Sequence, residues 1–374
     1  MKIQISKSDL QDAIKAVIKI IPTKAVVSDI ENVCIAGKDG IVTVAGTDLT
    51  TYVKYTIDGR CYFDGSFEFL IDAAKLDKIA SLCDNFVEIE LMSDKVKINT
   101  AQGNFTLPIY NSDSFPVKNN DGSKIADFNA KHQILHHIKK AVQFAGTDDL
   151  RPNICGVNLV VNDNKCSVQS TNLHICYKHD TECVSKENLE VVIPTKTCKI
   201  LSQLDNDNFV LYQLSSLEYR IQIGNIDVYF YTVEVKFPAV NSIIPAFHSH
   251  INVFSFKKSE LLKTMQAVLI TANNATNSIE FHVSNDSAML KSIDYDMCME
   301  CELEAKCSIE KKTDDVFSFA VNGKFMIDVV NSLNIPNSND VTMYMREAKQ
   351  AILFYTDDDS TILLIMPIVI NKVN

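Results

Sequence analysis

The chain repeats one pattern three times: an apolar strand, a short amphipathic helix and a second strand. The three helices are predicted at 72–82, 194–204 and 322–333, with starts offset by 122 and 128 residues. A second set at 6–21, 130–145 and 256–272 repeats with offsets of 124 and 127, judged by matching Ile14, Ile138 and Met265. An internal repeat of this length constrains architecture before any motif does. It predicts three domains of about 120 residues, at 1–124, 125–250 and 251–374.

The strand segments alternate apolar and polar residues. Residues 86–91 alternate up to a turn at Ser93 and Asp94, and 95–98 alternate again, as in a hairpin with one buried face. Segments 209–223 and 341–355 repeat the pattern. We therefore expect an α+β fold of antiparallel sheets with helices on one face, joined by linkers near 116–128 and 238–250.

Composition and targeting patterns indicate an ordinary globular protein. Hydrophobic residues make up 46% and charged residues 22% of the chain, which suits packed domains. Residues 1–7 alternate like a strand and lack the apolar core of a signal peptide. The apolar run 362–370 is interrupted by Pro367 and is far shorter than the ~20 residues of a membrane helix. We expect a cytoplasmic protein that does not bind membranes.

No motif in the chain predicts catalysis. It lacks a phosphate-binding loop, a zinc-protease motif and a nucleophile elbow. Cys298 and Cys301 form a CxxC with Cys307 nearby, but the nearest histidine is His282 and the segment alternates like a strand. Zinc sites usually show a second pair or closely spaced histidines. We therefore expect no metal, no cofactor and no enzymatic activity.

Charge is distributed unevenly. The six repeated helices contain 14 Lys and 6 Asp or Glu, a net charge of +8, which leaves −19 for the remainder of a chain at −11. Lysines are common on solvated helix faces. The alternative is that these helices, with His136 and His137 among their residues, share one surface that faces a polyanion.

The motifs along the whole chain resemble those of the bacterial sliding clamp, the beta subunit of the replicative DNA polymerase. In order, they are 105–108 with Phe115 and Pro116 (FTLP…FP), 149–157 (DLRPNICGV), 193–196 (IPTK), 236–245 (KFP…IP), 321–325 (VNGKF) and 364–368 (LIMPI). One segment departs from the family. Where the family usually has ATDGHRL, residues 170–176 read STNLHIC, so Leu173 and Ile175 replace a glycine and an arginine.

The resemblance implies a head-to-tail homodimeric ring of six domains around double-stranded DNA, with helices inside and sheets outside. It would be a processivity factor in DNA replication, binding DNA without sequence preference, and partnered by the polymerase catalytic subunit, the clamp loader and other proteins with a clamp-binding motif. Arginine is scarce, so the candidate DNA-facing cations are lysines: Lys15, Lys19, Lys24, Lys75, Lys78, Lys139, Lys140, Lys196, Lys199, Lys257, Lys258, Lys263 and Lys324.

Two further sets follow from the resemblance. The partner-peptide cleft would comprise Ile154, Thr171, Leu173, His174, Ile175, Cys176, Pro245, Leu364, Met366, Pro367 and Ile368. With Leu173 and Ile175 at its mouth, the cleft should be narrower and more apolar than in the family. The ring-closing seam would pair Phe105 and Leu107 with Leu269 and Ile270 of a second copy.

Two other classes remain open from the sequence. One is a monomeric β-rich interaction scaffold derived from a clamp that has lost the ring. The other is an enzyme that holds a metal through Cys298, Cys301 and Cys307.

Overall fold

The computed structural model describes residues 1–118, 122–185, 187–204, 208–244, 251–336, 338–356 and 360–369. Contacts group them into two compact units. The first unit comprises residues 1–136, 161–165 and 182–234, and the second comprises 137–160, 166–181 and 235–374. Each unit contains strands from more than one predicted repeat, and the boundaries at 124 and 250 stay a prediction.

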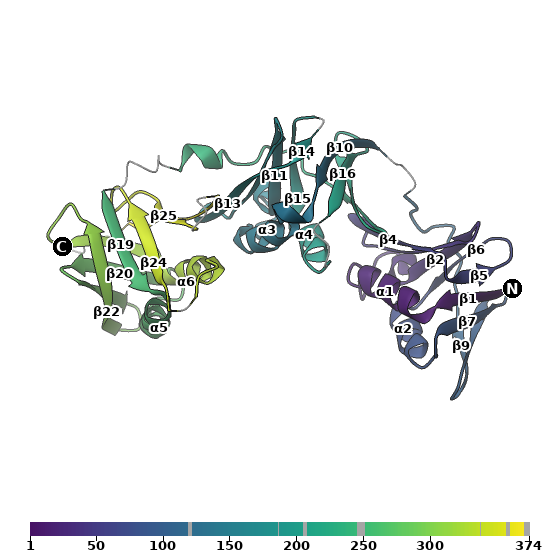
Figure 1. Ribbon diagram of the computed structural model, residues 1–374. Coiled ribbons are helices and arrows are strands. Elements are labelled where there is room, and N and C mark those ends of the chain that lie inside the picture. Colours follow the sequence, from purple (N-terminus) through teal and green to yellow (C-terminus); the bar gives the residue numbers. More distant parts are fainter. Residues whose placement is uncertain are drawn as a thin grey trace. The chain divides into compact units, whose positions relative to one another are not determined.

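The order of elements in the first third sets the pattern for the chain (Figure 1). A strand leads into a helix, five strands follow, and a second helix precedes three more strands. The elements are β1 (Lys2–Ser6), α1 (Lys7–Val17), β2 (Val33–Lys38), β3 (Ile41–Thr47), β4 (Thr51–Asp58), β5 (Cys61–Phe63), β6 (Phe67–Ile71), α2 (Ala73–Ser81), β7 (Phe86–Leu91), β8 (Lys95–Thr100) and β9 (Gly103–Pro108).

The second third repeats this order. Its elements are β10 (Ser123–Phe128), α3 (Ile134–Ala141), β11 (Gly156–Asn162), β12 (Lys165–Thr171), β13 (Ile175–Glu182), β14 (Val184–Ser185), β15 (Leu189–Pro194), α4 (Thr195–Leu201), β16 (Phe209–Gln213), β17 (Glu218–Ile223) and β18 (Ile226–Tyr231).

In the last third, one long strand takes the place of two. The elements are β19 (Asn252–Lys257), α5 (Lys258–Val268), β20 (Ser278–Ser284), β21 (Ser287–Asp294), β22 (Met299–Lys311), β23 (Phe317–Asn322), α6 (Gly323–Ser332), β24 (Asp340–Met345), β25 (Ile352–Tyr355) and β26 (Thr361–Ile365). Short 3-10 turns include η3 (Val142–Phe144) after α3, η4 (Pro152–Ile154) before β11 and η7 (Leu269–Thr271) after α5.

Two sheets form the first unit. The smaller has the strand order β5-β1-β7-β8-β9 and the larger has the order β14-β10-β16-β17-β18-β4-β3-β2-β6. Helix α1 packs against α2 and β4. In the second unit, β13 joins a sheet ordered β26-β25-β24-β19-β22-β21-β20-β23, and α5 packs against α6 and β22. Neighbouring strands such as β1 and β7, β4 and β18, and β13 and β26 are antiparallel, which confirms the α+β prediction.

The local sequence explains these elements. In the β7–β8 hairpin, Val87, Ile89, Val96 and Ile98 are buried while their neighbours face outward, as a half-buried antiparallel pair requires. Helices α2 and α6 begin at good N-caps: the carboxylate of Asp72 accepts from the Lys75 amide, and the Asn322 side chain accepts from the amides of Lys324 and Phe325.

The six predicted helices are present, and their α-helical bounds are shorter than the sequence suggested. The predicted linker at 116–128 was too long, because β10 already begins at Ser123. The CxxC is not wholly on a strand either. Cys298 lies in the turn before β22 with a φ of 52°, and Cys301 lies in β22. The cluster of three aspartates at 357–359, which the sequence places between two predicted strands, lies outside the described residues.

Candidate nucleic-acid and partner interface

Each helix buries one apolar stripe and turns lysines outward. In α1, Leu10, Ala13, Ile14 and Val17 are buried at the spacing of one helix face. The other helices follow the same rule, with buried stripes on α2, α4, α5 and α6. The predicted lysines left exposed are Lys15, Lys19, Lys24, Lys75, Lys78, Lys139, Lys196, Lys199, Lys257, Lys263 and Lys324, and Lys140 is half-buried.

Three of these lysines occupy an unfavourable place on their helices. Lys75, Lys196 and Lys324 lie in the first turn of α2, α4 and α6, where the helix dipole disfavours a cation. Two of them have a carboxylate partner: Lys75 Nζ lies 3.0 Å from Asp72, and Lys196 pairs with Asp48. A cation repeated at a position that does not favour helix stability points to a role outside the helix.

Lys258 corrects the predicted cation set. Its side chain is buried, and its ammonium donates to the carbonyls of Leu333 at 2.8 Å and Ile335 at 3.3 Å, beyond the end of α6. Burial lowers the pKa of Lys258, and the positive charge of Lys140 lowers it further. Lysine was predicted to point outward here because sequence alone does not reveal carbonyls that can satisfy a buried ammonium. Lys258 holds α5 to α6 and does not offer a charge to a polyanion.

His137 also differs from the expectation of an outward basic side chain. Its ring stacks on His179 of β13 with centroids 3.3 Å apart, and its Nδ1 lies 2.7 Å from the Tyr177 hydroxyl. His179 Nδ1 in turn lies 2.8 Å from the Thr361 hydroxyl of β26. These contacts belong to the packing of α3 on its sheet, whereas His136 is exposed.

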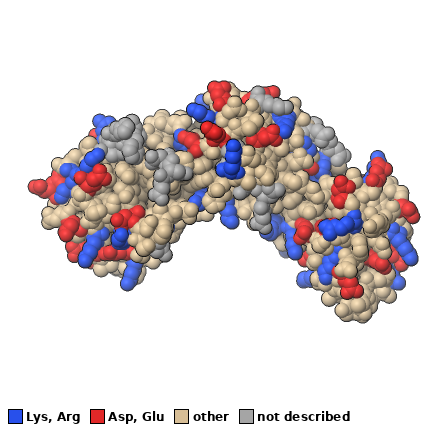
Figure 2. Space-filling model, viewed as in Figure 1, with Lys and Arg blue, Asp and Glu red and all other residues tan. Residues whose placement is uncertain are grey.

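Acidic and basic side chains are interspersed over the face seen in Figure 2. Ion pairs such as Lys291 with Glu302 and Lys54 with Asp227 tie cations to the sheets. The excess of lysine is therefore a property of the helices and not of the surface at large.

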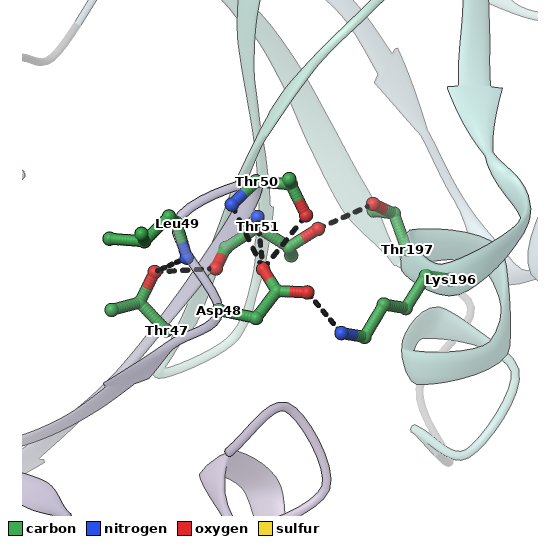
Figure 3. Close-up of polar contacts among 7 residues, drawn as sticks. All are labelled: Thr47, Asp48, Leu49, Thr50, Thr51, Lys196 and Thr197. Carbon is green, nitrogen blue, oxygen red and sulfur yellow. Dashed lines mark hydrogen bonds and ion pairs between the residues drawn. The ribbon is translucent and has the colours of Figure 1, made fainter. Parts of the chain in front are cut away.

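The turn between β3 and β4, residues 47–51, is held by its own side chains (Figure 3). The Thr47 hydroxyl donates to the Thr51 carbonyl at 2.8 Å and accepts from the Leu49 amide at 3.0 Å. The Asp48 carboxylate accepts from the amides of Thr50 and Thr51 and pairs with Lys196 of α4. The Thr51 and Thr197 hydroxyls lie 2.9 Å apart, so the turn is joined to α4 by two contacts.

The acidity of Asp48 reflects these bonds. Burial alone would raise its pKa, but the hydrogen bonds from Lys196, Thr51 and Thr50 outweigh burial and hold the pKa below its ordinary value. The carboxylate is thus charged at neutral pH.

The turn between β12 and β13, residues 171–175, repeats these bonds in the second unit. Thr171 donates to the Ile175 carbonyl at 2.7 Å and accepts from the Leu173 amide at 2.9 Å. The Asn172 oxygen accepts from the amides of His174 and Ile175, both at 2.9 Å. The ring of His174 stacks on Phe325 of α6, with centroids 5.7 Å apart.

The structure divides the predicted cleft residues into two groups. Leu173 and His174 are exposed, and Met366, Pro367 and Ile368 are half-buried. The Met366 amide donates to the His174 carbonyl at 2.7 Å, which places the end of β26 beside the turn. Pro245 lies outside the described residues.

The other predicted cleft residues do not reach the surface in this structure. Their side chains are buried: Ile154, Thr171, Ile175, Cys176 and Leu364. Ile175 and Cys176 pair with Ile365 and Leu364 across β13 and β26. Burial raises the pKa of the Cys176 thiol to about 12, as expected of a neutral core group. Of the two substituted positions, Ile175 is therefore buried and only Leu173 has an exposed side chain.

The predicted seam residues also divide. Ile270 is 78% exposed and Phe105 is half-buried, which leaves apolar surface on both. Leu269 is half-buried. It lies so close to Gly323 that a side chain at position 323 would collide with it. Leu107 is 8% exposed, so its side chain is already taken up by its own domain and offers little to a second copy.

Two expectations about absent features concern the described residues only. Within them, no three His, Cys, Asp or Glu side chains are grouped closely enough to hold a metal ion. Among the same residues, no helix is long and apolar enough to cross a membrane.

Sequence reasoning missed the two matching turns at 47–51 and 171–175, called the paired turns below, although the sequence carried a signal for them. Thr47-Asp48-Leu49 and Thr171-Asn172-Leu173 are 124 residues apart, which is the offset of the helix repeat. Short threonine and Asx side chains that bond to the backbone two and three residues on are a known turn signal. The histidine stack of His137 and His179 carried no such signal.

Comparison with known families gives two matches. The DNA polymerase III beta subunit N-terminal domain matches residues 1–119, and the central domain of the same family matches residues 130–239. Among curated proteins, the beta sliding clamp of Buchnera aphidicola subsp. Rhopalosiphum padi is 22% identical, with 96% of this chain and 97% of the relative covered. The beta sliding clamp of Staphylococcus epidermidis is also 22% identical, with 96% of each covered.

Solved structures show the same fold. The beta subunit of DNA polymerase III from Thermotoga maritima aligns with a TM-score of 0.87 at 18% identity, covering 99% of this chain and 100% of that chain. The Helicobacter pylori beta clamp, solved with a bound DNA ligase peptide, aligns with a TM-score of 0.82 at 18% identity and the same coverage.

Proposed function

The chain belongs to the DNA polymerase III beta subunit family, and we propose that it acts as a sliding clamp. Two copies would close head to tail into a ring around double-stranded DNA and keep the replicative polymerase on its template. The clamp loader and other proteins with a clamp-binding motif would share the ring. It would work in the cytoplasm as an accessory subunit without catalytic activity.

One observation carries this proposal: most lysines of the repeated helices face outward, Lys258 being buried, while the apolar stripes face the sheets. A sliding ring needs contacts that hold no fixed register on the duplex. Lysine suits this need because its ammonium is a mobile, hydrated point charge, whereas arginine favours a fixed bidentate geometry on phosphate. Such contacts are independent of sequence and weaken as salt rises. Topological linkage, and not affinity, would then retain the ring.

The linkage test uses circular and linear DNA. The loaded protein should remain on a closed or nicked circle and slide off the same DNA after it is cut once. Ordinary groove binding gives similar lifetimes on both forms, so equal lifetimes would contradict the proposal. Size-exclusion chromatography adds a second test, because the ring should run near twice 41.8 kDa, and a mass of one chain would favour the monomeric scaffold.

Charge reversal tests the lysine face directly. Lys139→Glu with Lys140→Glu should shorten retention on circular DNA, with a loss that grows as salt is lowered and screening weakens. An exposed helix substitution such as Lys139→Glu usually costs within about half a kcal/mol, and because Lys140 is half-buried, a thermal melt checks that the double variant is folded. The matched control is Lys306→Glu with Lys311→Glu, an equal charge change at exposed positions of β22. Unchanged retention at low salt would show that α3 does not face the duplex.

We propose the partner cleft at the residues whose side chains reach the surface: Leu173, His174, Met366, Pro367 and Ile368. A cleft of this kind takes a short extended peptide with one or two bulky apolar side chains. For ring closure, we propose Phe105 against Leu269 and Ile270 of the second copy, an apolar centre of the type that interfaces need.

A further inference from the structure

In each unit, the strand that follows the paired turn lies against a neighbouring strand in the same register. In the first unit, Thr51 and Tyr52 of β4 pair with Phe230 and Tyr229 of β18. In the second unit, Ile175 and Cys176 of β13 pair with Ile365 and Leu364 of β26. In the first unit, the residue after Phe230 is Tyr231. In the second unit, the residue after Ile365 is Met366. Tyr231 therefore occupies, beside the first turn, the place that Met366 occupies in the proposed peptide cleft.

A cavity opens at this place in the first unit. It has a volume of about 130 Å³, and its walls include Leu49, Tyr52, Pro116, Tyr229 and Tyr231. Leu49 is 55% exposed and Tyr231 is 43% exposed, and Figure 3 shows the Leu49 side chain directed away from Lys196. An apolar cavity of about 150 Å³ can hold benzene, so this one has room for a single branched aliphatic side chain.

The floor of the cavity is rigid and aromatic. Tyr52 and Tyr229 meet edge to face with ring centroids 5.7 Å apart, and Phe115 lies 6.4 Å from Tyr52. These rings belong to a buried cluster with Cys34, Ala45 and Leu70. An incoming side chain would meet a surface that is already ordered, which reduces the entropy cost of binding.

Lys118 at the rim of the cavity offers a cation to an acidic group on the occupant. At its rim, Lys118 donates to Glu218 at 2.6 Å and to the Tyr231 hydroxyl at 2.8 Å. Behind Tyr229, Lys54 and Arg220 share Asp227 at 3.4 and 3.5 Å. Lys118 and Glu218 line the cavity, whereas Lys54 and Arg220 lie against the ring of Tyr229, so Lys118 is the cation that an occupant can reach.

We propose that this cavity is a second docking pocket for an extended peptide, which inserts one branched aliphatic side chain and presents an adjacent carboxylate to Lys118. The peptide class rests on the proposed function, since the pocket repeats the turn and strand register of the cleft at Leu173 and Met366. Each chain would then bind two peptides, one in each unit.

Photo-crosslinking tests the pocket on the full-length protein. The probe is a capped pentapeptide, Ser-Leu-Asp-photoleucine-Ser, and the crosslinked segments are mapped by mass spectrometry with and without excess leucine peptide. We expect competable crosslinks both in 47–52 or 229–231 and in 171–175 or 366–369. A probe with asparagine in place of aspartate should label the segments 47–52 and 229–231 less strongly.

Two variants separate the sites. Tyr231→Ala should weaken labelling of the first-unit segments by about tenfold or more, the size expected for loss of an anchoring ring, and leave the second unit unchanged. Met366→Ala should do the reverse. Tyr62→Ala is the matched control, because this tyrosine of β5 is 60% exposed and lies outside the pocket. Leu49→Gly removes another wall, should Tyr231→Ala fail to fold.

The possible failures are distinguishable. Competable crosslinks confined to 171–175 and 366–369 would overturn the second pocket and leave the proposed function standing. Labelling of the first unit that Tyr231→Ala and Leu49→Gly leave unchanged would also overturn it. Labelling of neither unit overturns this pocket and the peptide cleft together, and retention on circular DNA then decides whether the ring itself stands.

Discussion

The turns at 47–51 and 171–175 have the same hydrogen-bond pattern and different surroundings. Each uses a threonine hydroxyl and an Asx oxygen to hold three backbone amides, and each places a leucine at a φ of 74°. The first turn carries the charged Asp48, which is paired with Lys196 of α4. The second carries the neutral Asn172, and His174 lies on the ring of Phe325 of α6.

This comparison separates what makes the turn from what joins it to a helix. The side chains that bond to the backbone are common to both turns and set their shape, because Asp and Asn offer the same acceptor oxygen. The contacts to the helices differ, with an ion pair in one unit and stacked rings in the other. An ion pair weakens as salt rises, whereas ring stacking depends mainly on buried apolar area. The two units should therefore respond differently to solution conditions.

The largest expected effect comes from removing the Asx side chains. Asp48→Ala loses two amide bonds, the bond from the Thr50 hydroxyl and the ion pair, and Asn172→Ala loses two amide bonds only. Because a hydrogen bond to a charged group contributes about 1.5–3 kcal/mol and a neutral one about 1 kcal/mol, local opening should become easier by about 3 and 2 kcal/mol, respectively. A chain with two compact units need not unfold in one step, so the measurement is amide hydrogen exchange at each turn.

Exchange should accelerate more at 50–51 in Asp48→Ala than at 174–175 in Asn172→Ala. Ser112→Ala, a change in a loop of the first unit outside both turns, serves as the control. Equal acceleration at the two turns would mean that the ion pair with Lys196 adds no stability to the turn at 47–51.

The next effect concerns the leucines. A bulky side chain at a φ of 74° is strained by about 1–2 kcal/mol, and glycine removes that strain at some cost in unfolded-state entropy. Leu49→Gly and Leu173→Gly should each stabilise their turn by about 0.5–1 kcal/mol, seen as slower amide exchange. Peptide binding at the corresponding pocket should weaken at the same time. Slower exchange with unchanged peptide binding would show that the leucines are not docking contacts.

The sequence predicted the elements that follow from periodicity. The alternation of 86–91 and 95–98 predicted the β7–β8 hairpin, and the helix predicted at 6–21 contains α1, whose Leu10, Ile14 and Val17 lie on one buried face. Both patterns are local, because one face of each element must be buried whatever the partner is. The order of elements in three repeats followed from the same signals.

The sequence could not predict contacts that depend on distant partners. Lys258 is satisfied by carbonyls of residues 333 and 335, which no local pattern reveals. Ile175 and Leu364 were expected at a cleft surface, but their pairing across β13 and β26 buries both. Likewise, a cation at the start of α4 gives no sign that Asp48, 148 residues earlier, will meet it. The surroundings of these side chains depend on partners far away in the sequence, and the local periodicity of the sequence does not reveal such partners.

The smallest effect isolates the charge of Asp48. Asp48→Asn keeps an acceptor for the amides of Thr50 and Thr51, as Asn172 does in the second turn, and loses only the ion pair with Lys196. Because the Lys196 side chain is 54% exposed, solvent screening limits the expected loss to about 0.5 kcal/mol. The folded-state pKa of Asp48 is lowered. Its contribution is therefore complete above the unfolded value of about 3.9 and disappears as pH falls through the lower folded value.

Amide exchange at 50–51, compared between wild type and Asp48→Asn and corrected for intrinsic rates, should thus differ at pH 6 and converge as pH falls below about 4. The reverse change, Asn172→Asp, gives the matched comparison. Lys324 holds in α6 the helix position that Lys196 holds in α4, so a carboxylate at 172 should gain a few tenths of a kcal/mol, lost again in acid and in high salt. If Asn172→Asp shows no salt-dependent gain, position 324 is not within reach of the second turn. The two junctions would then differ in geometry as well as in charge.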